Sequence, residues 1–236
     1  MAVFTEQTVR DNLRNRDGKR VFYLADGDHL TPSAREWLRR ERIEILRAEQ
    51  AKPSRYRTLS GSILLEKSEH MTHLYDDVLV PKDHPRIVFR GWVDRMQAEL
   101  LLAEKTMKPD VCAVLEEVLS VLRTILACDV LDKPLELPTL YGRSMEQIRQ
   151  QSHFPQNHFD QPHFMPSAAD DESLLQLNRL RALSRQVELA ACYAFQDRDG
   201  NVTRPDIVQA LNRISSVLYL LMIQQKKEQE HGKQPR

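Results

Sequence analysis

The stretch from residue 111 to residue 131 constrains the fold of this chain more than any other feature. Its apolar residues recur three and four positions apart, which places them on one face of an α-helix. They are Val111, Val114, Leu115, Val118, Leu119, Leu122, Ile125 and Leu126. An apolar stripe of this length is typical of a helix packed in a bundle.

Further helices are predicted around this one. The spacing of apolar residues favours helices over residues 86–104, 170–195 and 206–225, with a shorter one over 144–151. We therefore expect a mainly α fold, a four- to five-helix bundle, for residues 61–225. Residues 226–236 are polar, and we expect them to form a frayed tail.

Residues 1–60 predict a small N-terminal α/β extension that ends in a linker. Residues 20–24 and 43–45 form short apolar strand candidates. Between them, Thr31 is suited to an N-cap and Pro32 to the first helical position. Residues 47–62 are polar and without periodicity, which favours a linker or insert.

Composition narrows the class of protein. Lys and Arg together number 34, and Asp and Glu also number 34, so the chain lacks the basic excess of a general nucleic-acid binder. Only 7 glycines occur, and no Gly-rich phosphate loop, so side chains and helix ends would have to hold any bound phosphates. No apolar run approaches the ~20 residues of a membrane span, and residues 1–20 are polar. We expect a cytoplasmic protein without a membrane segment.

The cysteines and histidines favour no metal site. Cys112, Cys128 and Cys192 lie far apart in apolar stretches, as buried free thiols do in a reducing compartment. Residues 152–168 contain three prolines and no periodicity, which predicts a loop, and carry His153, His158 and His163. Zinc needs three or four converging ligands. Walls of a ligand pocket, or hydrogen bonds within the loop, are the favoured roles for these histidines.

Polar residues at helical spacing mark candidate sites. Arg181, Arg185 and Glu188 share one helix face, and two guanidiniums on one stripe suit a polyphosphate. The same spacing also fits a solvated surface with an Arg–Glu pair. Asp94 with Gln97, and Asn212 with Ser216, have similar spacing and the same two interpretations.

Taken together, these segments resemble the ATP:corrinoid adenosyltransferases of the propanediol-utilisation type. The family's R-T-V-C-R-R-A-E helix is similar to Arg181–Glu188, and its L-N-R-L-S-D-Y-L-F helix to Leu211–Tyr219, where Ser216 replaces the aspartate. Its G-T-x-D-E-L-N segment is similar to Gly91–Gln97, and its F-x-L-P-G loop to His163–Ser167.

Other segments resemble the ethanolamine-utilisation branch of that family: L-T-P-S-A-R at 30–35, H-M-T-H-L at 70–74, C-D-V-L-D-K-P-L at 128–135 and H-F-M-P-S-A-A-D at 163–170. The glycines of the family's T-R-x-G-D-x-G loop are missing, although Thr72 and Lys82 can stand for its threonine and lysine. No cysteine precedes Cys112, so the Cys-Cys-x-x-Cys cluster of some members is absent.

The resemblance implies an activity and roles for residues. The expected reaction transfers the 5′-deoxyadenosyl group of ATP to cob(I)alamin, with Mg²⁺. It assigns ATP binding to Thr72, Lys82, Arg185, Glu188 and Asn212. It assigns corrinoid binding to Phe164, Phe159 and His163, with Phe164 as an aromatic wall that removes the lower axial ligand of cobalt. Arg181 is expected to pair with Asp94 across a subunit boundary. The resemblance implies that Arg181, Asp94 and Phe164 are catalytic.

The resemblance also implies partners: a homo-oligomer, either trimer or dimer, with the site at the subunit interface, a reductase, and ethanolamine ammonia-lyase, inside a bacterial microcompartment. Two alternatives stay open. One is a corrinoid-binding escort that holds adenosylcobalamin for a lyase without making it, and the other is a helical scaffold of a microcompartment.

Overall fold

The computed structural model describes residues 3–16, 19–47, 56–64, 66–137 and 139–232. The chain divides into two compact units, each with its own hydrophobic core. The first comprises residues 1–69 with 77–79, and the second comprises residues 70–76 with 80–236. The division thus falls after Glu69, whereas the sequence placed it after residue 60.

The first unit begins with a small α/β arrangement, as expected. Its elements are β1 (Val3–Phe4), α1 (Glu6–Asp11), β2 (Arg14–Arg16), β3 (Lys19–Leu24), β4 (His29–Leu30), α2 (Pro32–Arg40) and β5 (Glu44–Arg47). Strand β3 pairs antiparallel with β2 and parallel with β5, and β1 pairs parallel with β4. Thr31 caps α2 by accepting from the Ala34 N–H at 3.3 Å, which confirms the predicted helix start.

Part of the predicted linker is a strand instead. Residues 48–55 lie outside the described residues, but β6 (Tyr56–Thr58) pairs antiparallel with β7 (Ile63–Leu64) and parallel with Val78–Leu79 of β9 (Val78–Pro81). Arg57 also holds both carboxylate oxygens of Asp77, at 2.9 and 2.8 Å. Strand β7 is near in the sequence, but β9 and Asp77 lie about 20 residues further along the chain, so no local periodicity could reveal these two partners.

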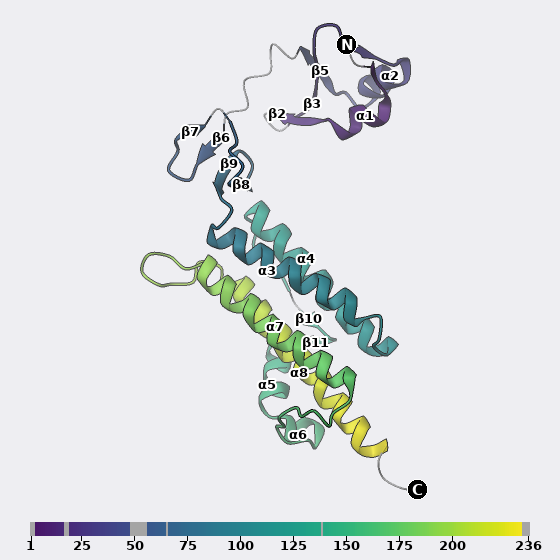
Figure 1. Cartoon of the computed structure of the whole chain (residues 1–236), viewed down its shortest axis with the longest axis vertical. Coiled ribbons are helices and arrows are strands. Elements are labelled where there is room, and N and C mark those ends of the chain that lie inside the picture. The colour runs from purple at the N-terminus through teal and green to yellow at the C-terminus, as the bar shows by residue number, and fades with distance from the viewer. Residues whose placement is uncertain (1–2, 17–18, 48–55, 65, 138, 233–236) are drawn as a thin grey trace. The chain divides into compact units, whose positions relative to one another are not determined.

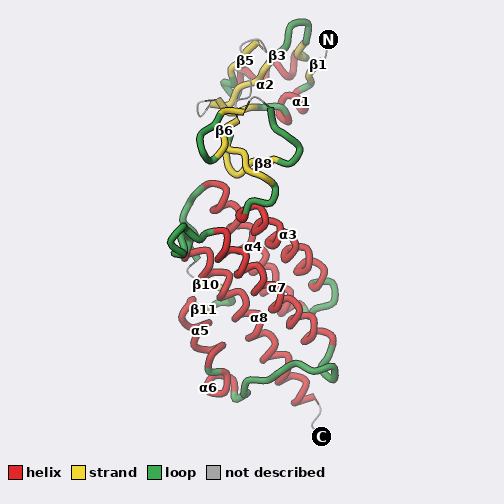
Figure 2. Tube along the Cα trace, turned by 60° about the vertical axis from the view of Figure 1, so that its left-hand side comes forward, coloured by secondary structure: helices red, strands yellow, loops and turns green. Residues whose placement is uncertain are grey.

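The second unit is the predicted helical bundle. Its helices are α3 (Pro85–Ala103), α4 (Pro109–Leu131), α5 (Met145–His153), α6 (Pro155–Phe159), α7 (Glu172–Ala194) and α8 (Pro205–Gly232), preceded by β8 (Met71–Tyr75). Figures 1 and 2 show the four long helices, α3, α4, α7 and α8, packed along one another within this unit. The apolar stripe of α4 is buried, as predicted, except that Leu126 is only partly buried.

A long connection between α4 and α7 carries the remaining elements. It contains the hairpin β10 (Thr139–Leu140) and β11 (Arg143–Ser144), whose two-residue turn has positive φ at Tyr141 and Gly142, as such hairpins require. Ser144 then starts α5 with a capping box. This connection packs α5 against α8. The end of α5 forms one wall of the cavity described below.

Three sequence predictions for the second unit need correction. Residues 152–168 are not all loop, because α5 continues to His153 and Pro155 opens α6; proline fits the first turn of a helix. Residues 226–232 are not a frayed tail, because α8 continues to Gly232. Lys226 holds Asp170 at 2.7 Å and Lys227 donates to the Phe159 carbonyl at 2.6 Å, which ties these last turns to the bundle. The three cysteines are free, but they are only partly buried.

Helix α8 is long and apolar enough to pass a composition test for a membrane span, over Pro205–Glu230. Within the described residues, however, 67% of its most apolar window is buried inside the bundle. Its apolar side chains therefore have a protein environment already, as expected for the central helix of a bundle.

A buried ion cluster joins three elements of the second unit. Asp129 of α4 is fully buried and accepts from Arg86 Nε at 2.8 Å and Arg90 Nε at 2.6 Å, both on α3. Arg90 also donates to the Leu74 carbonyl of β8 at 2.8 Å. Because every member has a partner, this cluster fixes β8 and α4 against α3.

Candidate active site

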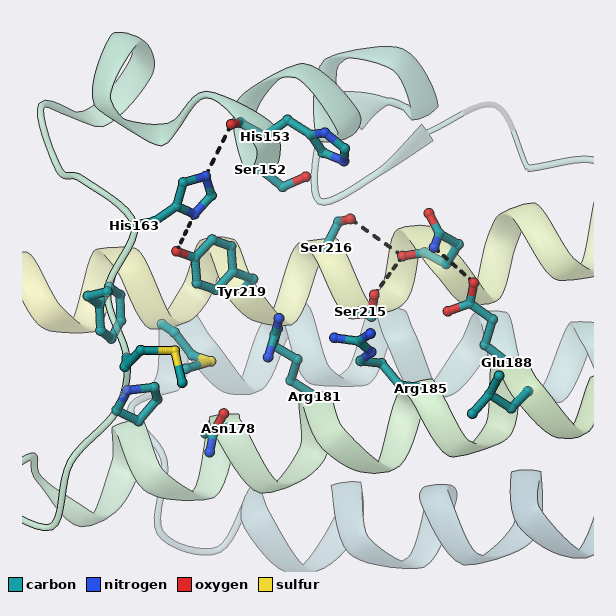
Figure 3. Close-up of a pocket in the computed structure, with 16 residues that line it drawn as sticks. Ser152, His153, His163, Asn178, Arg181, Arg185, Glu188, Ser215, Ser216 and Tyr219 are labelled. Atoms are coloured by element: carbon teal, nitrogen blue, oxygen red, sulfur yellow. Dashed lines mark hydrogen bonds between the residues drawn. The ribbon is translucent and has the colours of Figure 1, made fainter.

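A cavity of about 730 Å³ lies between the end of α5, the loop that follows α6, and the facing sides of α7 and α8. Figure 3 shows its lining. The residues are Ser152, His153, His163, Phe164, Met165, Pro166, Asn178, Arg181, Arg185, Glu188, Leu189, Asn212, Ser215, Ser216, Tyr219 and Met222. The volume is that of a typical small-molecule site.

Helix α7 supplies the charged wall of this cavity. Its apolar face is buried in the core through Leu177, Leu180, Val187 and Ala191. Arg181, Arg185 and Glu188 lie on the face beside it, each one position after a buried residue, and they point along one side of the cavity (Figure 3). The predicted stripe thus lines a cavity.

A hydrogen-bond network fixes Glu188 against α8. Asn212 Nδ2 donates to Glu188 Oε1 at 2.9 Å, and the Arg213 guanidinium donates to Asn212 Oδ1. Because Arg213 can only donate, it determines which way the Asn212 amide faces. Burial lowers the pKa of the Arg213 guanidinium, which is only 8% exposed.

The loop after α6 supplies the aromatic wall. Phe164 lies nearly parallel to the Tyr219 ring, with centroids 6.1 Å apart and an interplanar angle of 26°. The Arg181 guanidinium also lies over the Tyr219 ring, 5.2 Å from its centroid. Burial is the main reason that the pKa of Tyr219 is raised, against the opposing charge of Arg181.

The cavity combines strong donors with one carboxylate. Arg185 is exposed, and none of the residues that the structure describes forms an ion pair with it. Glu188 is the one acidic residue in the lining. No group of three or more His, Cys, Asp or Glu suited to a metal ion occurs among the described residues. The arrangement suits an anionic ligand next to a flat apolar one.

Comparison with known proteins identifies the family. A sequence profile described as cobalamin adenosyltransferase matches residues 65–225, which span the whole bundle except the end of α8. The chain belongs to the cobalamin adenosyltransferase family.

Individual relatives agree with this membership. The corrinoid adenosyltransferase EutT of Salmonella typhimurium is 30% identical over 93% of this chain and 90% of its own length. EutT of Escherichia coli strain K12 is 31% identical over the same shares. Among solved structures, a variant PduO-type ATP:co(I)rrinoid adenosyltransferase from Lactobacillus reuteri, complexed with ATP, superimposes with a TM-score of 0.50 and 14% identity. That match covers 68% of this chain and 92% of the other, and it supports the fold alone.

Six of the residues predicted from the resemblance to this adenosyltransferase family meet in the cavity. They are His163, Phe164, Arg181, Arg185, Glu188 and Asn212. They come from the loop, α7 and α8, segments separated by up to about fifty residues, so the fold brings them together.

Four predicted residues lie elsewhere in the adenosyltransferase bundle. Asp94 is exposed on α3, Thr72 lies on β8, and Lys82 is exposed between β9 and α3. Phe159, at the end of α6, lines a separate cavity of about 390 Å³ with Tyr141 and Lys227. Within one chain, none of the four lines the cavity of Arg185.

Tyr219 is one of several cavity residues to which sequence reasoning gave no role. It stands seven positions after Asn212, and residues seven apart share a helix face. That spacing was available in the sequence, but tyrosine fits equally well as a core residue of an apolar helix.

Proposed function

We propose that this protein transfers the 5′-deoxyadenosyl group of ATP to the cobalt of cob(I)alamin, forming adenosylcobalamin for ethanolamine utilisation. The observation that carries the proposal is the shared cavity of Arg185, Glu188 and Phe164. Residues that family resemblance assigns to the nucleotide and to the corrinoid lie next to each other there. Membership of the family and the two EutT relatives support the same reaction.

In this reaction, all of the reacting atoms belong to the two substrates. The Co(I) electron pair attacks C5′ of ATP and becomes the new Co(III)–carbon bond. The C5′–O bond breaks, and triphosphate leaves with the electron pair of that bond. No side chain has to act as a covalent nucleophile. The protein aligns cobalt, C5′ and the leaving oxygen, and it neutralises the charge that develops on the phosphates.

Arg185 is suited to the leaving triphosphate, because its guanidinium faces the cavity without a competing carboxylate partner among the described residues. Asn212 and Glu188 would orient the nucleotide, held by the network through Arg213. A Mg²⁺ ion fits this lining, because Mg²⁺ takes one or two protein carboxylates and otherwise binds phosphates and water. Glu188 would supply that carboxylate.

Phe164 is suited to the corrinoid. Its ring is partly buried in the loop wall, beside the exposed Met165, and together they offer an apolar surface. An apolar wall against the lower face of the corrin would exclude the axial ligand and ease reduction to Co(I). His163 holds this wall, as discussed below, and Phe159 would contribute only if the corrinoid extends to the neighbouring cavity.

The site is proposed to be completed by a second copy of the chain, in a dimer or trimer. Asp94, Thr72 and Lys82 lie outside the cavity within one chain, and Arg181 has an aromatic contact but no carboxylate partner among the described residues. An Asp94 from another copy would supply that carboxylate, and Thr72 and Lys82 would reach ATP from there.

Replacing Asp94 with alanine is therefore expected to lower both assembly and turnover, because removal leaves the interfacial Arg181 charge uncompensated. Light scattering after size-exclusion chromatography measures the first, and adenosylcobalamin formation the second. Glu116→Ala, which removes an exposed carboxylate of α4, is the matched control. An Asp94→Ala protein that is active and assembles normally contradicts the interface proposal.

A corrinoid escort is the second candidate function, because Thr72 and Lys82 lie outside the cavity. One experiment distinguishes the enzyme, the escort and the scaffold. Anaerobic protein is mixed with cob(I)alamin, ATP and Mg²⁺, and absorbance follows adenosylcobalamin. Turnover supports the enzyme, whereas corrinoid binding without turnover supports the escort. Absence of binding supports a scaffold. A cytoplasmic location, inside a microcompartment with a reductase and ethanolamine ammonia-lyase, belongs to the same proposal.

A further inference from the structure

The loop that carries Phe164 is held by two helices, α5 and α8, through one residue of the loop, His163. His163 Nδ1 lies 2.9 Å from the Tyr219 hydroxyl of α8, and His163 Nε2 lies 3.1 Å from the His153 carbonyl at the end of α5. Figure 3 shows both contacts in one line, from α5 through the loop to α8. The residue that follows His163 in the chain is Phe164.

The chemistry of these groups determines which atom donates the hydrogen in each bond. The His153 carbonyl can only accept, so the hydrogen of a neutral His163 ring must be on Nε2. Nδ1 is then the acceptor, and the Tyr219 hydroxyl must donate to it. A phenylalanine at position 219 could fill the same space but could not make this bond.

Tyr219 also contacts both the aromatic wall and the charged wall of the cavity. Its ring lies against Phe164 on the loop and beneath the Arg181 guanidinium of α7. The backbone amide of Phe164 and the charge of Arg181 both lower the pKa of Tyr219, against the larger opposing effect of burial. The phenol is thus in contact with the loop and with the charged wall at once.

We propose that Tyr219, acting through His163, is the positioning residue that holds the Phe164 loop in place to receive the flat apolar face of the corrinoid. This inference rests on the proposed function for its ligand. The geometry of the loop anchor, meaning His163, Phe164 and Tyr219, stands independently of that function. Tyr219 touches no reacting atom. Its proposed effect is to keep the loop ordered.

The test replaces Tyr219 with phenylalanine, which keeps the ring but removes the hydroxyl. Hydrogen exchange of the backbone amides in residues 160–168 is expected to accelerate about fivefold to tenfold, the effect of one lost hydrogen bond. The KM for cob(I)alamin is expected to rise by a similar factor, while the KM for ATP stays unchanged. A general loss of folding would move both constants.

Two further variants make the result specific. Tyr141→Phe removes another tyrosine hydroxyl that bonds α8, through Gln224 at 2.9 Å, outside this cavity. It should leave the hydrogen exchange of residues 160–168 as in the wild type. The double variant Tyr219→Phe/His163→Ala should accelerate exchange by less than the product of the two single-variant factors, because both changes break the same bond between His163 and Tyr219.

Unchanged exchange in Tyr219→Phe, or additive effects in the double variant, would overturn the proposal. If the wild-type protein makes no adenosylcobalamin, the proposed function fails. The exchange measurement still decides whether the loop anchor exists, so the two failures are distinguishable.

Discussion

Replacing Asp129 with alanine is expected to lower the free energy of unfolding by about 3–5 kcal/mol, because it leaves two arginines partly buried without their carboxylate. Arg86 and Arg90 are each 18% exposed at the side chain, and Asp129 is fully buried. Of the hydrogen bonds found among the described residues, Arg86 would keep the one to the backbone oxygen of residue 129, and Arg90 the one to the Leu74 carbonyl. Urea unfolding followed by circular dichroism measures the change.

The matched control for this prediction is Glu116→Ala, which removes an exposed carboxylate from the same helix. Its expected cost is within about 0.5 kcal/mol, as for most surface substitutions. Equal stability losses for the two variants would show that the Asp129 cluster is not a main support of the bundle. Asp129→Asn, which keeps the shape but loses the charge, should fall between the wild type and Asp129→Ala.

Replacing Arg185 with alanine is expected to lower kcat/KM for adenosylcobalamin formation by about 10²- to 10³-fold, the usual effect of removing one donor that stabilises transition-state charge. The side chain is exposed in the cavity and forms no ion pair with any described residue, so its loss should leave stability nearly unchanged. Initial rates under anaerobic conditions, with ATP varied at saturating cob(I)alamin, measure the effect.

Arg179→Ala is the control for Arg185. Arg179 lies on the same helix, but its guanidinium pairs with the Glu99 carboxylate at 2.8 Å. The Arg179 side chain is 66% exposed. Exposed pairs contribute little, so activity should stay within about twofold of the wild type. An Arg185→Ala enzyme as active as Arg179→Ala would remove Arg185 from the triphosphate site and leave the charged stripe as a solvated surface.

The helices could be predicted from the sequence because their apolar spacing is local. The stripe of α4 and the start of α2 at Thr31 and Pro32 follow directly from periodicity and capping. Strand β6 could not be predicted, since one of its two partner strands, β9, lies about 20 residues along the chain. The last turns of α8 were also missed, because their polar residues are held by Asp170 and Phe159 on other elements.

The candidate site was predictable only in part. Spacing placed Arg181, Arg185 and Glu188 on one face, but it could not say whether that face met solvent or a cavity. Only the packing of α7 on α8 brings Asn212 to Glu188. The role of Tyr219 depends on a contact with His163, 56 positions earlier in the sequence, which no local pattern encodes.

The central claim is that this chain forms the bond between cobalt and C5′ of ATP. The most direct measurement gives the anaerobic protein cob(I)alamin, Mg²⁺ and ATP carrying ¹³C at C5′, and analyses the corrinoid by mass spectrometry. We expect one labelled, light-sensitive adenosyl group on each corrinoid formed, with triphosphate or its cleavage products released in equal amount. Unlabelled corrinoid recovered after prolonged incubation, with ATP intact, would contradict the central claim.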